Sequence, residues 1–259
     1  MTALFEMRHV GKRFGGLAAV DDFSISIGGG ELVGLIGPNG AGKTTVFNVI
    51  SGFIPPTGGE VFWKGASITG FPAHRVAAAG IARTFQNIRL FGDMSVLENV
   101  MVSFHHSLRS NFMHAMLGTP RHRKEESRIR RESMSCLEET GLAHLFAEKA
   151  ANLPYGQQRK LEIARALATR PRLLLLDEPA AGMNPSETME LAALIRRIRD
   201  NHGTGIFLIE HDMKFIMRLC ERIKVLDHGQ SIAEGAPADI RKNLAVIKAY
   251  LGSTGYASS

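Results

Sequence analysis

The 259-residue sequence has only two cysteines, few aromatic side chains and no long hydrophobic run. Cys136 and Cys220 lie far apart and form no metal-ligand pair, so we expect neither a disulfide framework nor a zinc site, and a reduced cytosolic setting is favoured. No apolar run approaches the roughly 20 residues that a membrane-spanning helix needs, and the first residues lack the apolar core of a signal peptide. These absences argue against a secreted disulfide-rich module and against a membrane-embedded protein.

The sequence does contain a moderate apolar fraction and an excess of positive charge. The hydrophobic fraction of 44% fits a globular protein, and a chain of this length suffices for one α/β domain with a subdomain. Lysine and arginine number 31 against 25 acidic residues, a formal net charge of +6. Such a charge is compatible with nucleic acid or an anionic membrane surface as a neighbour. Nucleotide binding tolerates the same charge, so composition does not choose between these functions.

Short strand-like segments occur in two groups. Alternation of apolar and polar residues over residues 4–10 and 23–27 predicts two strands near the N-terminus, and residues 59–63 predict a third. Continuous apolar runs predict further strands that are buried on both faces. These runs are residues 31–36, 172–177, 205–210 and 222–226. Because helix-like segments separate the later runs, we expect a parallel sheet.

The segment between residues 95 and 170 is instead helical in character. Ser95 and Glu98 match a capping box, and residues 121–139 are charged and polar with an apolar seam. This pattern predicts an inserted helical subdomain. Residues 239–251 predict a helical tail near the C-terminus.

A glycine-rich motif follows the first buried run and precedes a predicted helix at residues 44–51. It reads Gly37-Pro38-Asn39-Gly40-Ala41-Gly42-Lys43-Thr44, followed by Thr45, and matches the pattern G-x-x-x-x-G-K-[ST]. Its glycines let backbone N–H groups surround the β- and γ-phosphates, at a helix N-terminus that already favours anions. We expect Lys43 to bridge phosphate oxygens and the Thr44 hydroxyl to bind Mg²⁺. All nine residues are predicted to form the ATP site.

An acidic pair ends the buried run of leucines at residues 173–176. Asp177 is predicted to stand at the carboxyl end of its strand, where ligands of open α/β sheets bind, and there to contribute to the Mg²⁺ shell. Glu178 is placed to orient or deprotonate an attacking water. Alone, such a pair is commonly a solvated strand end. Its combination with the phosphate loop favours ATP hydrolysis.

Together these motifs resemble those of the ATP-binding subunits of ABC transporters. A phosphate loop, a helical insertion, a glycine-glutamine helix start shortly before an Asp-Glu strand end, and a later histidine follow one another over nearly the whole chain. The resemblance implies an α/β P-loop NTPase fold with a mixed or parallel sheet, an N-terminal antiparallel β subdomain and an inserted α-helical subdomain. It implies one domain over residues 1–259, with the catalytic core in 1–86 and 171–240, the helical subdomain in about 87–170 and a tail in about 241–259.

The resemblance also assigns roles to single residues. Gln86 matches the Q-loop glutamine that contacts Mg²⁺ or water and senses the membrane partner, and His211 matches the switch histidine near the γ-phosphate. Phe14 occupies the aromatic position that stacks on adenine. Outside the family, Gln86 is an ordinary loop residue, His211 a capping residue before Asp212, and Phe14 a core residue. These alternatives stay open from the sequence alone.

The family's signature sequence usually reads Leu-Ser-Gly-Gly-Gln and closes over the γ-phosphate held by a second ATP-binding subunit. Here it reads Leu153-Pro154-Tyr155-Gly156-Gln157. Proline replaces the phosphate-binding serine and tyrosine replaces a glycine, whereas the helix N-terminus and Gly156 still offer backbone N–H groups. The D-loop differs as well, because Ala181-Gly182-Met183-Asn184 stands where Ser-Ala-Leu-Asp is usual. Both departures concern residues that are expected to act on the partner's nucleotide.

Three stretches are similar to one of the two ATP-binding subunits of high-affinity branched-chain amino acid importers, namely residues 87–95, 152–159 and 180–185. This similarity implies ATP hydrolysis coupled to import, with ATP and Mg²⁺ bound. It also implies a second, homologous ATP-binding subunit, two integral-membrane permease subunits, a periplasmic binding protein and a peripheral position on the cytoplasmic face of the inner membrane. Related ATPases import urea, short amides or other small solutes, and no residue of this chain is expected to contact the solute.

Two rival functions are weighed against import. An ABC-type ATPase acting on nucleic acid fits the basic charge, but the chain lacks the long coiled-coil insertion or tandem cassette of such proteins, so nucleic acid is disfavoured as a partner. A regulatory module without hydrolysis is disfavoured by Asp177, Glu178 and His211. Basic residues also gather in the helical insertion, at Arg109, Arg121, Arg123, Lys124, Arg128, Arg130 and Arg131. They form either a solvated helix face or a contact with anionic headgroups or a membrane subunit.

Overall fold

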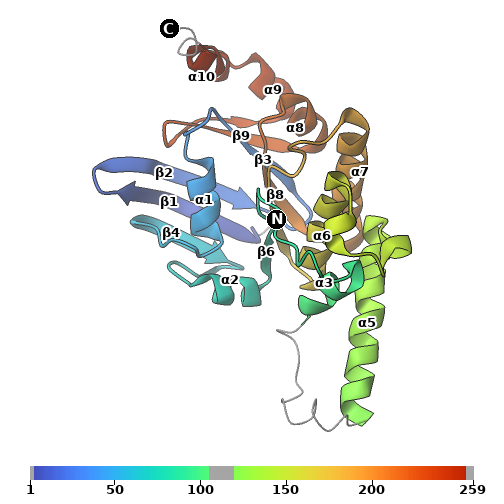
Figure 1. The fold of residues 1–259 in the computed structure, drawn as a ribbon. Coiled ribbons are helices and arrows are strands. Elements are labelled where there is room, and N and C mark those ends of the chain that lie inside the picture. Colours follow the sequence, from blue (N-terminus) through green and yellow to red (C-terminus); the bar gives the residue numbers. More distant parts are fainter. Residues whose placement is uncertain (1–2, 105–119, 255–259) are drawn as a thin grey trace. The chain divides into compact units, whose positions relative to one another are not determined.

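The computed structural model describes residues 3–104 and 120–254, and only the backbone of residues 120–122 and 251–254. The chain forms two compact units (Figure 1). Unit 1 comprises Met1–Arg83, Arg172–Ala181 and Thr188–Ser259. Unit 2 comprises Thr84–Pro171 and Gly182–Glu187.

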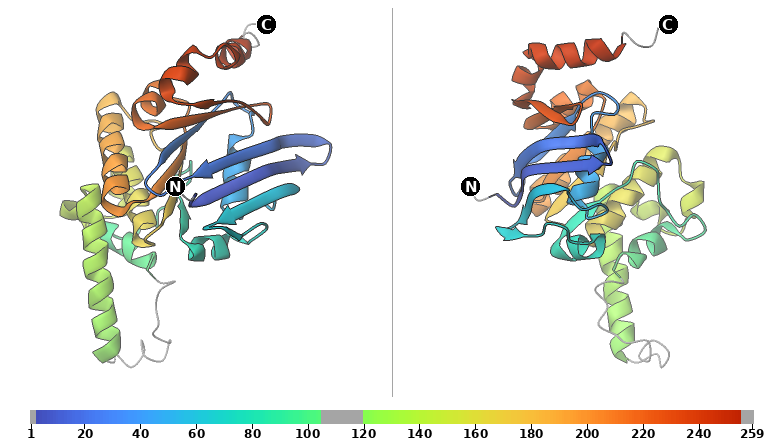
Figure 2. Two further views of the ribbon diagram at one scale, coloured as in Figure 1. Left: turned by 180° about the vertical axis from the view of Figure 1, so that it is seen from behind. Right: turned by 90° about the vertical axis from the view of Figure 1, so that its left-hand side faces the viewer.

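Unit 1 contains a four-stranded antiparallel sheet built from the N-terminal segments. Its strands are β1 (Phe5–Phe14), β2 (Leu17–Ile27), β4 (Gly58–Trp63) and β5 (Ala66–Ser67), in the order β2-β1-β4-β5. The blue and cyan strands lie side by side in both views of Figure 2. Alternate residues Phe5 and Met7 are buried, as the period of a half-buried strand requires. The register of the β1–β2 pair shifts between Met7 and Val10. The N-terminal strands predicted from the sequence are confirmed.

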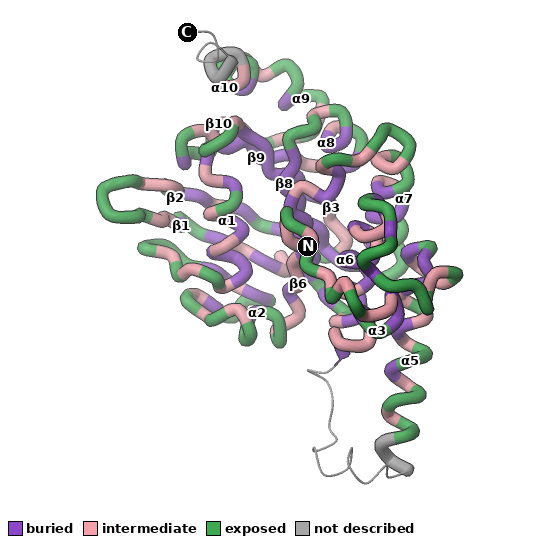
Figure 3. Tube along the Cα trace, in the orientation of Figure 1, coloured by how far each residue is buried: buried purple, intermediate pink, exposed green. Residues whose placement is uncertain are grey.

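The second sheet of unit 1 is mixed and has six strands in the order β10-β9-β3-β8-β7-β6. They are β3 (Leu32–Ile36), β6 (Ile81–Arg83), β7 (Leu173–Asp177), β8 (Gly205–Ile209), β9 (Arg222–Asp227) and β10 (Gln230–Gly235). Five of them are parallel, and β10 pairs antiparallel with β9. Every residue of β3, β7 and β8 is buried (Figure 3), which explains their uninterrupted apolar sequences.

The helices of unit 1 pack against this sheet or extend from it. They are α1 (Lys43–Ile50), α2 (Ala73–Ala79), α7 (Pro185–His202, whose first turn belongs to unit 2), α8 (Met213–Leu219), α9 (Pro237–Lys242) and α10 (Leu244–Thr254). Side chains of α1 and of both sheets share one core, in which the rings of Phe47 and Phe207 are 5.2 Å apart. This shared core holds the start of α1 close to the strand ends that carry the predicted motifs.

The helical tail predicted over residues 239–251 is observed, but it consists of two helices. The tail is divided into α9 and α10 at Asn243, whose φ and ψ of −72° and 119° are extended rather than helical. Its side-chain oxygen accepts hydrogen bonds from the amides of Ala245 (2.9 Å) and Val246 (3.3 Å). Asn243 therefore caps a new helix, as asparagine favours, instead of continuing the old one.

Unit 2 is helical and has its own apolar core. Its main helices are α3 (Val96–Val102), α5 (Pro120–Thr140) and α6 (Tyr155–Ala168), with short 3-10 turns at Ala143–Leu145 and Ala150–Asn152. The capping box is confirmed, because Ser95 Oγ accepts the amide of Glu98 (3.2 Å) while Glu98 Oε2 accepts the amide of Ser95 (2.8 Å). The basic side chains from Arg123 to Arg131 lie on α5, whereas Arg109 and the side chain of Arg121 lie outside the described residues.

Candidate functional site

The phosphate loop connects β3 to α1 and depends on glycine at several positions. Gly37, Gly40 and Gly42 have φ values of 154°, 80° and 103°, a region that other residues rarely adopt. A Cβ at Gly37 would lie 2.0 Å from the carbonyl oxygen of Leu226, and one at Gly42 would lie 2.3 Å from that of Ala19. The loop therefore has its conformation only with glycine, and no side chain caps the start of α1. Such a helix start suits an anion.

Lys43 lies at the first position of α1 and is directed into its own loop. Its Nζ donates hydrogen bonds to the carbonyl oxygens of Gly37 (2.6 Å) and Pro38 (2.9 Å), and the residue is 7% exposed. Burial lowers the pKa of Lys43, while the nearby carboxylates of Glu178 and Asp177 act in the opposite direction. The ammonium therefore lies in the field of both acidic residues. The next residue, Thr44, is exposed.

Asp177 ends β7 and is held by an arginine that was not predicted to belong to the site. Arg83, at the end of the neighbouring strand β6, donates from Nη2 to Asp177 Oδ2 at 2.7 Å, and both side chains are almost fully buried. Arg83 Nη1 also donates to Asn48 Oδ1 (2.8 Å) on α1 and to Ser51 Oγ (2.9 Å), the C-cap residue of the same helix. The ion pair thus fixes the carboxylate against the helix that follows the phosphate loop. The available signal was a lone arginine at the end of a short apolar segment just before Gln86.

Glu178 follows β7 in a strained backbone conformation. Its φ is 47°, in the left-handed region that costs a residue with a side chain about 1–3 kcal/mol. Its amide donates to the carbonyl oxygen of Ile209 at 3.0 Å, and its Oε1 lies 3.8 Å from Nδ1 of His211. His211 precedes the N-cap of α8, Asp212, and its side chain is 60% exposed. The structure thus brings Glu178 and His211 together beyond the ends of β7 and β8.

A second buried acid supports this corner and was not predicted. Glu210 is 1% exposed and accepts hydrogen bonds from the amides of Ala180 (2.8 Å) and His211 (3.1 Å). Burial raises the pKa of Glu210, and the hydrogen bond from Ala180 opposes the rise. Glu210 therefore ties the loop after Glu178 to the residue before the helix α8. An acidic residue that ends an otherwise apolar strand was its sequence signal.

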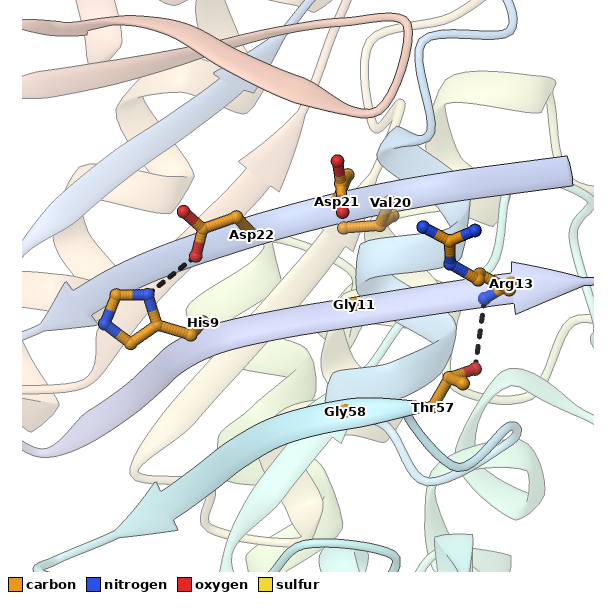
Figure 4. Close-up of a pocket in the computed structure, with 8 residues that line it drawn as sticks. All are labelled: His9, Gly11, Arg13, Val20, Asp21, Asp22, Thr57 and Gly58. Carbon is orange, nitrogen blue, oxygen red and sulfur yellow. Dashed lines mark hydrogen bonds and ion pairs between the residues drawn. The ribbon is translucent and has the colours of Figure 1, made fainter.

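Phe14 lies at the end of β1, and its ring is 50% exposed. The alternative that it is a core residue is wrong. Lys12 Nζ lies 5.1 Å from the centre of the ring. Figure 4 shows a separate hollow of about 310 Å³ on the antiparallel sheet, where His9 Nδ1 lies 2.6 Å from Asp22 Oδ1. None of the residues predicted to bind ATP lines this hollow.

Unit 2 contains Gln86, the signature sequence and three of the four D-loop residues. The remaining D-loop residue, Ala181, is the last residue of a segment of unit 1. Gln86 is exposed, Leu153 is buried, and Pro154 is the N-cap of α6 without a side-chain capping bond. The amide of Gln157 donates to the carbonyl oxygen of Pro154 at 2.9 Å. The first turn of α6 is therefore formed by Pro-Tyr-Gly-Gln with no serine hydroxyl at its start.

Within unit 2 the signature and the D-loop are in contact. A Cβ at Gly182 would lie 3.3 Å from Cε1 of Tyr155, and a Cβ at Gly156 would lie 2.8 Å from Oε1 of Glu187. Glu187 in turn exchanges hydrogen bonds with Asn184, from the amide of Asn184 to Glu187 Oε2 and from the amide of Glu187 to Asn184 Oδ1, both at 3.0 Å. The signature therefore packs against the D-loop segment at two glycines, Gly156 and Gly182, and beside the carboxylate of Glu187.

The donor set beside the phosphate loop suits Mg²⁺ rather than a metal with a complete protein shell. Among residues 3–104 and 120–254, no group of three His, Cys, Asp or Glu side chains is placed to hold a metal ion. Mg²⁺ usually takes one or two carboxylates and fills its other positions with substrate phosphates and water. The Asp177 carboxylate lies close enough to Lys43 to act on its charge, and the Thr44 hydroxyl is accessible at the next position. These residues fit that requirement.

The comparisons with known proteins agree with this geometry. The family model described as "ABC transporter" matches residues 20–181, and the model described as "Branched-chain amino acid ATP-binding cassette transporter" matches residues 230–255. The high-affinity branched-chain amino acid transport ATP-binding protein BraF of Pseudomonas aeruginosa is 47% identical over 249 residues, which cover 96% of this chain and 98% of that one. LivG of Escherichia coli, with the same descriptive name, is 48% identical over 93% of this chain and 94% of its own.

Solved structures show the same architecture. The ADP conformation of MJ1267, an ATP-binding cassette of an ABC transporter, has a TM-score of 0.85 and 30% identity, covering 97% of this chain and all of that one. MJ0796, a bacterial ABC transporter cassette solved as a dimer, has a TM-score of 0.76 and 25% identity, covering 90% of this chain and 98% of that one. These likenesses confirm the predicted fold class. The chain belongs to the ABC transporter family and is one of its nucleotide-binding ATPases.

Proposed function

We propose that this chain powers the import of branched-chain amino acids as one of two ATP-binding subunits of a membrane transporter. The observation that carries the proposal is the near full-length similarity to BraF and LivG, together with the separate match of residues 230–255 to the branched-chain family model. An importer of urea, amides or other small solutes is the alternative. It shares the ATPase chemistry and differs only in subunits that this chain does not contain.

ATP binding is assigned to the phosphate loop and to Phe14. Backbone N–H groups of the loop 37–45, all except Pro38, surround the β- and γ-phosphates, and Lys43 exchanges its bonds to the Gly37 and Pro38 carbonyls for phosphate oxygens. Because Lys43 is already buried and confined, little side-chain freedom is lost when ATP arrives. The half-exposed ring of Phe14 offers a stacking surface for adenine.

Hydrolysis is assigned to Glu178, His211 and Gln86. Glu178 accepts a proton from the attacking water, and His211, whose Nδ1 lies 3.8 Å from Glu178 Oε1, stands beside it to approach the γ-phosphate. Thr44, Asp177 and Gln86 are the residues that would hold Mg²⁺, partly through water, and the ion would neutralise charge that develops on the phosphates. Arg83 keeps the Asp177 carboxylate in place at 2.7 Å.

The signature residues 153–157 and the D-loop residues 181–184 are assigned to the nucleotide of a second ATP-binding subunit. Support comes from the dimeric form of the similar cassette MJ0796 and from the exposed, serine-free start of α6. A different, homologous chain is the proposed partner in a head-to-tail dimer. In that dimer the backbone at Gly156 approaches the partner's γ-phosphate.

The remaining partners are two integral-membrane permease subunits and, through them, a periplasmic binding protein, with this chain bound at the cytoplasmic face of the inner membrane. None of the helices in the described part of the chain is long and apolar enough to span a bilayer. The relatives BraF and LivG are named as transport ATP-binding proteins, which supports association with separate membrane subunits.

The test is purification of the tagged full-length chain from membranes of its own cells, followed by reconstitution in lipid vesicles. We expect hydrophobic membrane proteins to co-purify, and ATP-dependent uptake of labelled leucine, with the Glu178→Gln protein as the inactive control. Uptake of urea or acetamide without leucine would replace the proposed solute by the alternative. Purification without membrane partners, or with bound nucleic acid, would overturn the transport function.

A further inference from the structure

A stripe of polar residues runs along one face of α6, from the exposed Tyr155 at its start to the buried Arg159 and Glu162. Tyr155, Arg159 and Glu162 follow one another at intervals of four and three residues, so they lie on one face of the helix. Arg159 is 3% exposed and Glu162 is 6% exposed, and Arg159 Nη1 donates to Glu162 Oε2 at 3.0 Å. A buried ion pair costs desolvation and is weak evidence of stabilisation. Because the pair begins two residues after the signature sequence, we look for a role other than stabilisation of the fold.

The guanidinium of Arg159 uses all five of its N–H donors. Nε donates to the Tyr155 hydroxyl at 3.2 Å, and Nη2 donates to the same hydroxyl at 2.9 Å and to the carbonyl oxygen of Gln86. Nη1 donates to the carbonyl oxygen of Phe85 at 2.7 Å and to Glu162. One side chain thus binds the first residue of α6 and the carbonyl groups of two consecutive residues, Phe85 and Gln86.

Two further side chains of α6 hold the segment that follows Gln86. Glu162 Oε1 accepts the amide of Arg89 at 3.0 Å, and Arg165 donates from Nη1 to the carbonyl oxygen of the same residue. Burial raises the pKa of Glu162, and the hydrogen bonds from Arg89 and Arg159 oppose the rise. The segment 85–89 is therefore attached to α6 at three backbone positions by side chains spaced along one helix.

Tyr155 is the residue that replaces a glycine in the family's usual signature. Its hydroxyl accepts the two bonds from Arg159, and its ring faces Gly182 of the D-loop, where a Cβ would lie 3.3 Å away. The same tyrosine thus contacts the D-loop with its ring and, through Arg159, the Q-loop with its hydroxyl. The exchange of glycine for tyrosine gains these contacts.

We propose that Arg159 is a positioning residue that joins the signature helix to the Q-loop, so that displacement of the loop carrying Gln86 is transmitted to Tyr155 and the start of α6. The proposal deepens the proposed function and rests on it for the roles of the two loops. The attachment itself depends only on contacts within unit 2. Lysine cannot replace Arg159 in this role. An ammonium has three N–H donors on one nitrogen, whereas the guanidinium has five N–H donors at fixed angles.

Hydrogen exchange of the full-length chain without nucleotide tests the attachment. In Arg159→Met the segment 85–89 should be held less tightly, so the amide of Arg89, which donates to Glu162 Oε1, should exchange about 10-fold or more faster, as expected when a hydrogen bond to a charged group is weakened. In Tyr155→Phe, which keeps the ring against Gly182, the increase should be about 2- to 10-fold. Residues 96–100 of α3 provide an internal reference. Arg170→Met is the matched control, since this arginine, which follows the C-cap of α6, is exposed and pairs with Glu132.

Wild-type exchange at residues 85–89 in both Arg159→Met and Tyr155→Phe would overturn the attachment. Equal acceleration throughout unit 2, residues 96–100 included, would show that Arg159 only stabilises the fold and would also overturn the proposal. The milder Tyr155→Phe change, which leaves the buried ion pair intact, distinguishes these outcomes if Arg159→Met folds poorly.

The assembled transporter tests the transmission. In Arg159→Lys we expect kcat for ATP hydrolysis to fall about 10-fold, while KM for ATP changes less than about twofold because the phosphate loop lies in unit 1. A raised KM with unchanged kcat would assign Arg159 to nucleotide binding and reject transmission. If the wild-type complex neither hydrolyses ATP nor transports, the proposed function fails, whereas the exchange result on the isolated chain still decides the attachment.

Discussion

The phosphate loop and the signature sequence are both loops that lead into a helix, but different parts of the chain shape them. In the phosphate loop, the conformation comes from glycines with positive φ, and Lys43 bonds to carbonyl groups of the same eight-residue motif. At the signature, Gly156 and Tyr155 are the residues that matter, and their neighbours are Glu187, Gly182 and Arg159. Backbone atoms, including the carbonyl groups of Ala19 and Leu226, fix the first loop, whereas side chains fix the second.

This difference shows which part of an ATPase of this kind is open to change. Any Cβ at Gly37 or Gly42 meets backbone atoms that cannot move aside, so the phosphate loop keeps its family pattern. The signature can hold tyrosine in place of glycine because the Arg159 side chain donates to its hydroxyl and Gly182 of the D-loop leaves room for its ring. The chemistry in unit 1 is thus expected to follow the family, while the coupling in unit 2 is expected to depart from the usual family pattern, as the signature and the D-loop do.

The largest expected effect concerns the chemistry of unit 1. Glu178→Gln should reduce ATP hydrolysis by about 10²–10⁴-fold, the usual loss when a general base is removed. ATP affinity should stay near that of the wild type, because the contacts of Lys43 and Asp177 are unchanged. Phosphate release and nucleotide titration on the same preparation measure the two quantities. Turnover equal to wild type would place the base elsewhere and remove the main assignment of unit 1.

The next effect concerns the signature. Gly156→Asp places a Cβ and a carboxylate where backbone is proposed to approach the partner's phosphate, so hydrolysis by the assembled transporter should fall by about 10- to 150-fold, the equivalent of about 1.5–3 kcal/mol for a lost charged hydrogen bond. The isolated chain should still bind ATP, because its own phosphate loop is intact. Assays on the transporter and on the isolated chain separate the two sites.

A structural explanation competes with this prediction and has its own control. The new Cβ would lie 2.8 Å from Oε1 of Glu187 in the same chain. If that clash were the cause, the double variant Gly156→Asp/Glu187→Ala would recover activity; we expect that it does not. Loss of ATP binding by the purified Gly156→Asp monomer would assign the signature to the chain's own pocket and end the head-to-tail interpretation.

Motifs made of contiguous residues were predictable, and contacts between distant residues were not. The strands β3, β7 and β8 followed from their apolar runs because burial on both faces requires such runs. In contrast, β10 was not predicted, since an edge strand with mostly exposed and half-buried residues carries no apolar pattern. The break at Asn243 was missed for a related reason: a single capping side chain, rather than a change of hydrophobicity, starts α10.

The same distinction holds for the site. The nine residues of the phosphate loop and the pair Asp177–Glu178 could be assigned to chemistry from their order along the chain. Arg83 and Arg159 could not, because their partners Asp177 and Phe85 lie 94 and 74 residues away. In the sequence, an arginine that will be buried cannot be distinguished from an exposed one, because its hydrogen-bond acceptors come from other parts of the fold. The spacing of Tyr155, Arg159 and Glu162 on one helix face was the remaining signal, and it needs the burial of that face to be interpreted.

A smaller effect is expected at the adenine position of unit 1. Phe14→Ala should weaken ATP binding by about 1–3 kcal/mol, the range for loss of one stacking contact, whereas Lys43→Ala should abolish most binding. The ring is half exposed, so the variant should melt close to the wild-type temperature. Nucleotide titration of both variants checks the ranking. Wild-type affinity in Phe14→Ala would show that adenine binds without this ring, and the hollow beside His9 and Asp22 would then need the same test.

The smallest expected change is in the stability of unit 2. It concerns a surface that we expect to dock a membrane subunit, formed by Gln86, Ile88, Leu90, Phe91 and Met94. Phe91 is 48% exposed, and Arg165 lies 5.1 Å above its ring, while Asn99 holds its backbone through the amide (2.9 Å) and the carbonyl (3.0 Å). The ring is therefore presented outward from a fixed backbone, as an interface residue would be.

Phe91→Glu should change the free energy of unfolding by less than about 1 kcal/mol, because only an exposed cation–π contact is lost and the new carboxylate lies near Arg165. Leu90→Glu should destabilise more, since Leu90 packs against the core of unit 2. In the assembled transporter, Phe91→Glu should nevertheless uncouple ATPase from transport by disturbing the apolar contact with the permease. Urea unfolding of the isolated chain and uptake by vesicles measure the two effects. Equal destabilisation by Phe91→Glu and Leu90→Glu, with ATPase and assembly lost together, would make Phe91 a structural residue and leave the permease without this docking site.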